Sequence, residues 1–477
     1  MSRINTNVPS LTAQRSLQKS QRGLSDTLQR LSTGLRINRG GDDPAGLIAS
    51  EGLRSEITGI GQAIDNSQRA SNVIATTEGS LGEVASLLLN IKSMVVEAAN
   101  TGALSREEIE ANQLQVDSAI ESITRISNTT TFAGLRLLDG SLDYVTSGVA
   151  PAAISSLKLQ QANFGQADNI SVDVEVVTSA RPAELVFSNA TVSASVTLEI
   201  NGNEGVDTLT FTSGTTAQNV FTAVNGLSDT TGVMAEYVNG TDASGGIALR
   251  STGYGVRSFV SVAAQSGGTF ATVDANGDPR QRAEGRDAVA TVNGALTVGD
   301  GLNLKLNTNN LDFDLTLNEG FGAGTTRFDI TGGGSLFQLG PKVSSNQQVN
   351  IGIQSVAASK LGDSTLGFLN QVSSGGDAAL VLNGGPARAS KILEEAIKQV
   401  AVLRGRLGAF ERNTLETNVN SLNIAMENVT ASESKIRDAD FAQETANLTR
   451  SQILTQAGTS VLATANSTPQ SVLSLLQ

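Results

Sequence analysis

Residues 53–88, LRSEITGIGQAIDNSQRASNVIATTEGSLGEVASLL, carry an apolar seam whose positions alternate steps of four and three residues. The seam positions are Leu53, Ile57, Ile60, Ile64, Ser67, Ser71, Ile74, Glu78, Leu81, Ala85 and Leu88. A heptad pattern kept for about five repeats is typical of a long helix that packs against other helices. We expect one continuous helix over residues 46–100, roughly 80 Å long at ~1.5 Å per residue.

Signals for a helix start and a helix end flank this seam. Residues 38–46, NRGGDDPAG, read as a turn that leads into a helix. Asp42 or Asp43 fits the N-cap, because a short carboxylate side chain can accept from a free amide of the first turn. Pro44 fits the first helical position, where no amide hydrogen is needed. At the far end, we expect Gly102 to serve as the C-cap.

Further seams lie on both sides of the first one. Near the N-terminus, apolar spacing runs through Leu17, Gln21, Leu24, Leu28, Leu31 and Leu35. Another helix is predicted from Ser105, which forms a capping-box pattern with Glu108 and precedes the run Ile109, Gln113, Val116, Ile120 and Ile123.

The C-terminal seam contains one irregular step. Ala396, Val400, Leu403, Leu407 and Phe410 keep one phase, and Leu415, Val419, Leu422, Met426, Val429, Glu433 and Ile436 resume it. The step from Phe410 to Leu415 spans five residues, which should locally disturb the supercoil.

The middle of the chain is predicted to be rich in strands. Residues 191–200 and 206–212, separated by Asn201-Gly202, read as strand, turn and strand. Residues 246–250, 257–264 and 287–318 are further strand candidates, and residues 216–227 are a short helical candidate. The fold class is therefore α+β, with long terminal helices in an antiparallel or coiled-coil bundle and a β-rich outer insertion.

Charge divides the chain in the same way. The 477 residues carry a net charge of −13, and residues 141–387 account for −11 of it and for 33 of the 49 glycines. Residues 1–140 have a net charge of −2, and residues 388–477 are neutral. Like-charged outer regions keep a protein soluble, so we expect the acidic middle to face water while the nearly neutral ends pack together.

The composition excludes several classes of protein. The chain contains no His and no Cys, which rules out imidazole or thiolate metal sites, a Ser-His-Asp triad and a disulfide. We therefore expect no cofactor, no metal and no enzymatic activity. The acidic pI near 4.7 argues against a nucleic-acid partner, and no apolar run approaches the ~18–20 residues of a membrane span. An acidic stretch at Asp274 departs from a calcium loop at two positions, Pro279 and Gly285, and is read as a turn.

Narrow seams on both terminal segments suggest assembly between copies. A helix with such a seam buries little apolar surface by itself, so most of its stability comes from packing against partners. The alternative is an ordinary intramolecular helical bundle. A contact between copies that does not close on itself would give a helical filament.

Both ends of the chain carry distinctive motifs. Residues 30–38, RLSTGLRIN, and 42–47, DDPAGL, are similar to the N-terminal signature of bacterial flagellins, as is the start INTN at residues 4–7. Residues 434–441, SKIRDADF, 452–462, QILTQAGTSVL, and the ending PQSVLSLLQ are similar to the C-terminal motifs. The resemblance covers about half of the chain, 1–140 and 388–477.

This resemblance implies a subunit that polymerises into the flagellar filament and leaves the cell unfolded through the flagellar type III apparatus. The N-terminus lacks the apolar stretch of a cleavable signal peptide, which fits that route. The implied localisation is extracellular, in the filament. The implied partners are other copies of the chain, an export chaperone, and the cap and hook-junction proteins, with no membrane and no nucleic acid.

The resemblance also implies a domain arrangement. Residues 1–45 with 440–477 would form the inner filament core, residues 46–180 with 345–439 a helical shell with some strands, and residues 181–344 a β-rich, acidic, surface-exposed insert. We expect that much of 190–330 can be deleted without loss of polymerisation. The expected subunit-assembly residues are Leu17, Leu24, Leu28, Leu31, Leu35, Ile436, Phe441, Ile453, Leu454, Val461, Leu462, Val472, Leu473 and Leu476.

Two alternatives remain open at this stage. A hook–filament junction protein shares the terminal helices of flagellins, although the complete C-terminal motif favours flagellin. The insert could also act as an adhesin or carbohydrate-binding region displayed on a filament.

Overall fold

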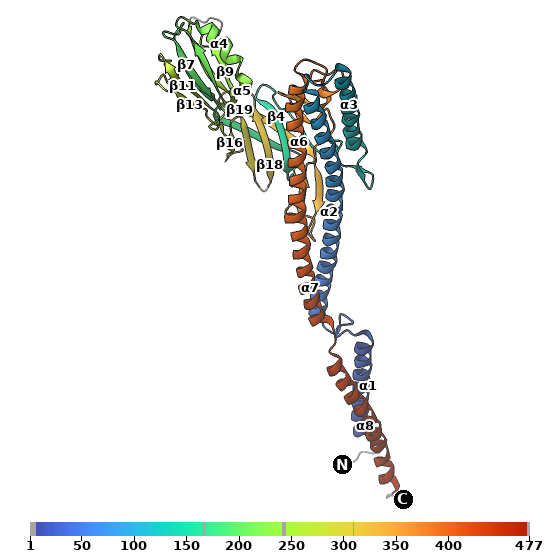
Figure 1. Cartoon of the computed structure of the whole chain (residues 1–477). Coiled ribbons are helices and arrows are strands. Elements are labelled where there is room, and N and C mark those ends of the chain that lie inside the picture. The colour runs from blue at the N-terminus through green and yellow to red at the C-terminus, as the bar shows by residue number, and fades with distance from the viewer. Residues whose placement is uncertain (1–5, 166, 241–244, 309, 475–477) are drawn as a thin grey trace. The chain divides into compact units, whose positions relative to one another are not determined.

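The computed structural model describes residues 6–165, 167–240, 245–308 and 310–474, without the side chains of 469–474 (Figure 1). Two compact units are present. The first comprises Met1–Ala70, Gln338–Val343 and Arg412–Gln477, and the second comprises Ser71–Phe337 and Ser344–Glu411. Helix α2 (Pro44–Ala98) contributes residues to both units.

The first unit consists of two antiparallel helix pairs. Helix α1 (Val8–Thr33) pairs with α8 (Phe441–Ser474), and the N-terminal part of α2 pairs with α7 (Thr417–Arg437) (Figure 1). In the second pair, Ile60, Ala63 and Ile64 of α2 form a small core with Leu422. The connections between the pairs also contact each other, because the amide of Arg36 donates to the carbonyl oxygen of Arg437 at 2.7 Å. These contacts confirm the expected antiparallel packing of the two chain ends.

The start of α2 follows the predicted turn chemistry. Pro44 is its first residue, and the carboxylate of Asp43 accepts from the amide of Gly46 at 2.9 Å. The predicted end at Gly102 is wrong. The helix ends at Ala98, and the amides of Ala103 and Leu104 donate to the carbonyl oxygen of Asn100 instead.

The second unit contains three helices that meet along apolar seams. They are the C-terminal part of α2, α3 (Arg106–Thr129) and α6 (Gly385–Phe410). The predicted capping box between Ser105 and Glu108 is present at the start of α3. Ion pairs from Lys92 to Glu394 (3.1 Å) and from Arg404 to Glu78 (3.7 Å) link α2 to α6. Fully buried apolar residues of α2 and α6 include Ile74, Leu81, Leu88, Ile91, Ile392 and Leu393.

A π-helical turn, Glu411–Glu416, separates α6 from α7. It lies where the sequence seam takes its five-residue step from Phe410 to Leu415. A π turn accommodates one extra residue within a helix, and Leu415 is 1% exposed. The predicted disturbance of the helix is confirmed. The π turn absorbs the extra residue, so the apolar side chains after it stay on the buried face.

One β core draws on two distant parts of the chain. Its first sheet has the order β15-β14-β5-β19-β3 and its second has the order β16-β17-β18-β4. The strands are β3 (Tyr144–Ser147), β4 (Ile154–Ala162), β5 (Ile170–Thr178), β14 (Val289–Val292), β15 (Ala295–Leu296), β16 (Val298–Asp300), β17 (Asn303–Asn307), β18 (Leu311–Leu317) and β19 (Gly324–Gly333). Phe313 and Phe328 meet edge to face in this first β core.

A second β core is built from residues between Arg181 and Arg286. Its sheets have the orders β12-β6-β10-β9 and β13-β11-β7-β8. The elements are β6 (Pro182–Phe187), β7 (Val196–Asn201), β8 (Val206–Phe211), α4 (Ala217–Asn225), α5 (Ser228–Thr231), β9 (Val233–Tyr237), β10 (Ile247–Tyr254), β11 (Phe259–Gly267), β12 (Val273–Asp274) and β13 (Arg282–Glu284). The predicted hairpin is confirmed as β7 and β8, and the short helical candidate as α4.

Smaller elements complete the described chain. Three two-stranded sheets pair β1 (Thr131–Phe132) with β2 (Leu135–Arg136), β20 (Ser335–Gln338) with β21 (Gln348–Ile351), and β22 (Gly362–Asp363) with β23 (Gly367–Phe368). Two 3₁₀ turns span Ser345–Gln347 and Leu369–Val372.

Candidate assembly surface

The contact between α1 and α8 is made by small and polar side chains. The hydroxyl of Ser10 donates to the side-chain oxygen of Asn466 at 2.8 Å, and the side-chain amide of Asn7 donates to the carbonyl oxygen of Ala465 at 2.8 Å. Gly458 faces Leu17 so closely that a Cβ atom there would lie 3.2 Å from Cδ1 of Leu17. Small residues such as Gly458 let the two helices approach. The buried residues of α1 are Ser10, Ala13 and Thr27, so little apolar surface is buried between the helices.

One ion pair crosses the other end of this contact. Nη1 of Arg30 lies 3.3 Å from Oε1 of Glu444, whose side chain is 8% exposed. The second carboxylate oxygen, Oε2, is buried without a hydrogen-bond partner among the described residues. A buried acceptor without a partner costs about 1–3 kcal/mol, so the attraction of Arg30 is the main compensation for this buried charge.

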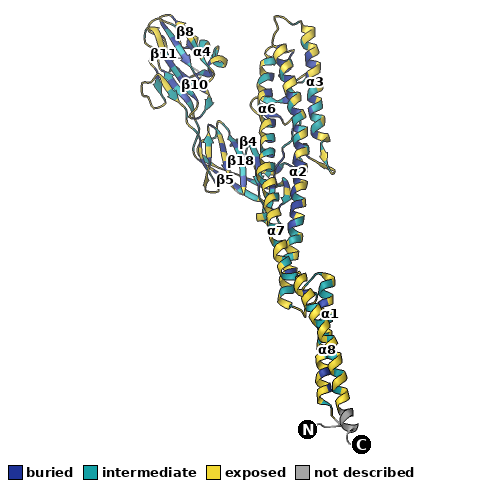
Figure 2. Cartoon of the chain, turned by 60° about the horizontal axis from the view of Figure 1, so that its bottom comes forward, coloured by how far each residue is buried: buried dark blue, intermediate teal, exposed yellow. Residues whose placement is uncertain are grey.

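Several large apolar side chains of α1 and α8 remain exposed to solvent. Leu28 is 49% exposed, and on α8 Ile453 is 62% and Val461 58% exposed. Phe441 and Leu454 are exposed as well. Figure 2 shows both helices coloured mainly as exposed or intermediate. We call the exposed set Leu28, Phe441, Ile453, Leu454 and Val461 the outer apolar face.

The remaining predicted assembly residues are less exposed or lie outside the description. Half-buried positions are Leu17, Leu24, Leu31, Leu35, Ile436 and Leu462. The side chains of Val472 and Leu473 lie outside the described residues, as does Leu476 altogether.

Sequence reasoning missed four residues of this region. Val8 and Leu11 are 57% and 52% exposed and lie on a stripe of α1 that the four-and-three seam does not include. Arg30 and Glu444 were missed because they are polar. The one signal in the sequence was their opposite charge, since Arg30 lies near the C-terminal end of α1 and Glu444 near the N-terminal end of α8.

The structure provides little for catalysis. Within the described residues, no group of three or more Asp and Glu side chains is arranged to hold a metal ion. Asp274 closes a turn, because its Oδ1 accepts from the amides of Asn276 (2.9 Å) and Asp278 (3.0 Å). These hydrogen bonds lower the pKa of its carboxyl group.

Helix α2 is long and apolar enough, by length and composition alone, to cross a membrane. This is weak support for a span, since core helices of soluble proteins pass the same test. Three apolar seam residues of this helix, Ile74, Leu81 and Leu88, are fully buried within the chain itself. That burial favours packing against helices.

Family models match both ends of the chain. The model described as "Bacterial flagellin N-terminal helical region" covers residues 4–143, and that described as "Bacterial flagellin C-terminal helical region" covers residues 390–476. Neither model covers the β-rich middle.

Curated relatives match along the whole length. A flagellin from Salmonella typhimurium is 30% identical over 505 residues, which covers 99% of both chains. A flagellin from Salmonella rubislaw is 29% identical over 513 residues, and the B-type flagellin of Pseudomonas aeruginosa is 29% identical over 529 residues, again with 99% coverage of each chain.

Solved structures show weaker similarity. FliC from Burkholderia pseudomallei has 15% identity and a TM-score of 0.23, with coverage of 72% of this chain and 99% of that chain. The junction protein FlgL from Legionella pneumophila has 12% identity and a TM-score of 0.28, with coverage of 82% and 99%. Similarity at this level carries no argument about function, so the sequence relatives decide the assignment.

Proposed function

Because this chain belongs to the bacterial flagellin family and is a structural subunit of the flagellar filament, we propose that its outer apolar face forms the contacts between subunits. As a flagellin it is not an enzyme, and it serves motility after export by the flagellar apparatus.

The exposed aliphatic side chains are the observation that carries this proposal. Leu28, Ile453 and Val461 lie on helices whose mutual contact is polar and leaves them in water. Burying one such side chain fully contributes about 1.5–3 kcal/mol, so burial of several of them between copies would stabilise an assembly. Neighbouring copies would supply that burial, and the half-buried positions Leu17, Leu24, Leu31, Leu35, Ile436 and Leu462 would border the same contacts. Val472, Leu473 and Leu476 would extend them to the C-terminal end.

We propose that the segments have three roles in the filament. Residues 1–45 with 440–477 form the inner core, and residues 46–180 with 345–439 form the surrounding shell. Residues 181–344 project outward. Charge supports this arrangement, since residues 141–387 hold −11 of the net −13 and the ends are nearly neutral.

We propose further that the export chaperone, the cap protein and the hook-junction proteins are its partners before and during assembly. An apolar surface that is exposed in a single copy needs protection in the cell, and a chaperone that covers α8 would provide it. In this proposal the assembled chain lies outside the cell, in the filament.

The test compares two substitutions to Asp in the full chain. Ile453→Asp should raise the critical concentration for polymerisation at least tenfold, because an unpaired charge in an apolar contact is costly. Val206→Asp is the matched control, since Val206 is 58% exposed but lies on β8 of the second β core. Sedimentation of seeded polymerisation reactions and electron microscopy provide the readout. Filaments from Ile453→Asp at the wild-type critical concentration would refute the proposed surface.

The two alternatives are not favoured. The curated relatives that match over 99% of their own length carry the name flagellin. Growth of long filaments from the purified chain alone also distinguishes a filament subunit from a junction protein.

A further inference from the structure

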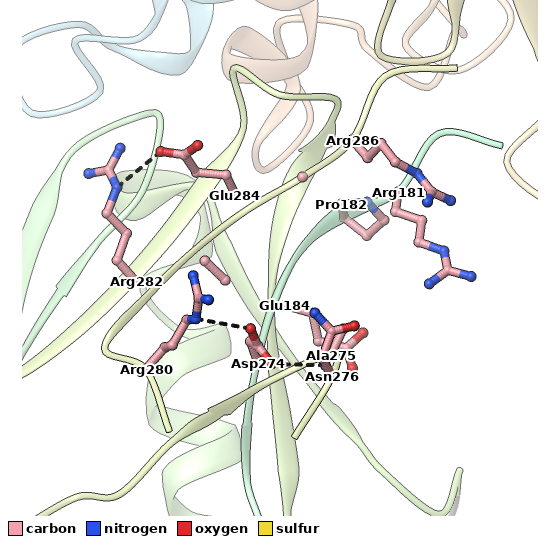
Figure 3. A pocket seen from close by; sticks show the side chains of 12 residues that line it. Arg181, Pro182, Glu184, Asp274, Ala275, Asn276, Arg280, Arg282, Glu284 and Arg286 are labelled. Atoms are coloured by element: carbon pink, nitrogen blue, oxygen red, sulfur yellow. Dashed lines mark hydrogen bonds and ion pairs between the residues drawn. The ribbon is translucent and has the colours of Figure 1, made fainter. Parts of the chain in front are cut away.

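A polar pocket lies at the point where the chain enters and leaves the second β core (Figure 3). Its volume is about 520 Å³. Four arginines line it: Arg181, Arg280, Arg282 and Arg286. Three carboxylates also line it: Glu184, Asp274 and Glu284.

Arg181 and Arg286 face each other across a short antiparallel bridge. The amide of Arg181 donates to the carbonyl oxygen of Arg286 at 2.8 Å, and the amide of Arg286 donates back at 2.9 Å. In such a hydrogen-bonded pair the two side chains stand on the same face of the bridge, where like charges repel. Figure 3 shows both side chains leaving the paired backbone on the same side.

The carboxylates of the pocket are already paired with other arginines. Asp274 lies 3.1 Å from Arg280, and Glu284 lies 3.5 Å from Arg282. Glu184 accepts from Arg250 at 2.7 Å.

No carboxylate among the described residues forms an ion pair with Arg181 or Arg286. The guanidinium of Arg286 has one weak contact, a hydrogen bond of 3.3 Å to the carbonyl oxygen of Ser179. The two guanidinium groups therefore form a site of uncompensated positive charge within an acidic region.

The basic residues around the second β core are all arginines. Between Lys158 and Lys305 every basic residue is an arginine, and the chain has no lysine there. The planar guanidinium group presents two parallel N–H donors that match the two oxygens of an oxyanion, which the ammonium group of lysine cannot do.

We propose that Arg181 and Arg286 together bind an oxyanion, with a carboxylate or sulfate group accepting hydrogen bonds from both guanidinium groups. The bound anion offsets the repulsion between the two guanidinium groups. It thereby stabilises the paired backbone where the chain enters and leaves the second β core. This site is separate from the proposed assembly contacts, because it lies within the second β core and shares no residue with α1 or α8.

The test uses the full-length chain at low and constant ionic strength. Sodium sulfate, sodium glucuronate and uncharged glucose serve as probes in calorimetric titrations and in thermal melts. Sulfate or glucuronate should bind and raise the melting temperature of the second β core, while glucose should do neither. Binding of sulfate alone indicates an inorganic anion site, and tighter binding of glucuronate indicates that the carboxylate of a larger ligand is recognised.

Three variants make the test specific. The double substitution Arg181→Gln with Arg286→Gln should weaken anion binding at least tenfold. Arg286→Lys keeps the charge but loses the paired donors, so it should also weaken binding several-fold. Arg257→Gln is the control, since Arg257 is an exposed arginine of the same region that already pairs with Asp300 at 3.2 Å.

Two results would overturn the proposal. One is anion binding that the double variant leaves unchanged, which would indicate general charge attraction. The other is no binding or thermal shift with either anion in the unmodified chain. Because polymerisation is not the readout, failure here leaves the proposed assembly surface untouched.

Discussion

Nη1 of Arg30 lies 3.3 Å from Oε1 of the buried Glu444, and this ion pair joins α1 to the N-terminal end of α8. The other described contacts between these helices include the hydrogen bond from Ser10 to Asn466 and the packing of Leu17 against Gly458. The pair therefore contributes specificity to a contact that has little apolar burial.

Removing the positive charge of Arg30 should destabilise the contact between α1 and α8. Arg30→Met leaves the carboxylate of Glu444 buried without its cation, at a cost of about 1–3 kcal/mol. Amide hydrogen exchange of α1 and α8 should become roughly tenfold faster or more, since 1.4 kcal/mol corresponds to about one decade. Arg15→Met, at an exposed position of α1, should leave exchange unchanged. Equal exchange in the two variants would show that the pair contributes nothing.

Changes at the C-terminal end should separate export from assembly. Removing the last six residues, or changing Leu473 and Leu476 to Asp, should leave a chain that is secreted but does not polymerise. An unpaired charge in an apolar contact costs several kcal/mol. Measurement of secreted monomer in the medium and of filaments on cells tests both parts. Normal filaments from the double substitution would refute the role of these residues.

A deletion confined to the second β core should preserve the rest of the molecule. Joining Arg181 to Arg286 through Asn-Gly gives a two-residue hairpin, because these residues already form a closed hydrogen-bonded pair. The first β core stays complete, since β14 pairs with β5. We expect this variant to fold and to polymerise like the full chain.

The sequence alone predicts that much of residues 190–330 can be deleted, but the strand pairing limits a tolerated deletion to the second β core. The longer deletion of residues 190–330 should therefore behave differently. It removes β14, β17 and β18 and exposes the partners of Phe313 and Phe328 in the first β core. We expect aggregation or loss of secretion for this variant. Thermal melts and filament counts compare the two deletion variants directly. Equal melting temperatures and filament counts would contradict the assignment of β14, β17 and β18 to the first β core.

Asp143 should make stability depend on pH. Burial raises the pKa of its carboxyl group, while the amide of Tyr144 and the charges of Lys360 and Arg406 lower it only in part. A raised folded-state pKa favours the folded chain while the group is protonated, and this stability is lost as pH rises through that value. Asp143→Asn should therefore raise the melting temperature at pH 7, with a gain that shrinks towards pH 4.

Asp139 provides the opposite case and the control. Burial would raise the pKa of its carboxyl group, but hydrogen bonds from Ser141 and the charge of Arg136 bring the pKa below its ordinary value. Its ionised form is stabilised in the folded chain, so this stability is present at neutral pH and is lost as pH falls. Asp139→Asn should lower the melting temperature at pH 7 and change it less in acid. Melting-temperature shifts of the same sign at pH 7 in Asp143→Asn and Asp139→Asn would contradict the opposite pKa directions of the two carboxyl groups.

The helical part of the fold could be predicted because its signals are local. The seam of α2, the N-cap at Asp43 and the capping box at Ser105 each depend on residues within a turn or two of each other. The end of α2 was misplaced at Gly102 because a glycine after a seam is only one way to end a helix, and here the chain turns at Asn100.

The β cores could not be derived in the same way. Strand pairs such as β5 with β14 join residues more than a hundred positions apart, and alternation along a strand does not identify its neighbour. The outer apolar face was partly predictable, since Leu28 and Ile453 stand in recognisable stretches. Which side chains turn outward depends on the small residues between α1 and α8, and their role becomes clear only when the helices are seen together.

The π turn at Glu411–Glu416 has a consequence for how the chain tolerates insertions and deletions. Each residue of an α-helix rotates the next by about 100°, and the wider π turn absorbs one residue without passing that rotation on. Deleting one residue from this turn would therefore restore regular α-helix and leave Leu422 on the side of α7 that packs against Ile60 and Ile64. The turn thus acts as a phase correction, and a single lost codon there would be less damaging than the same loss further along α7.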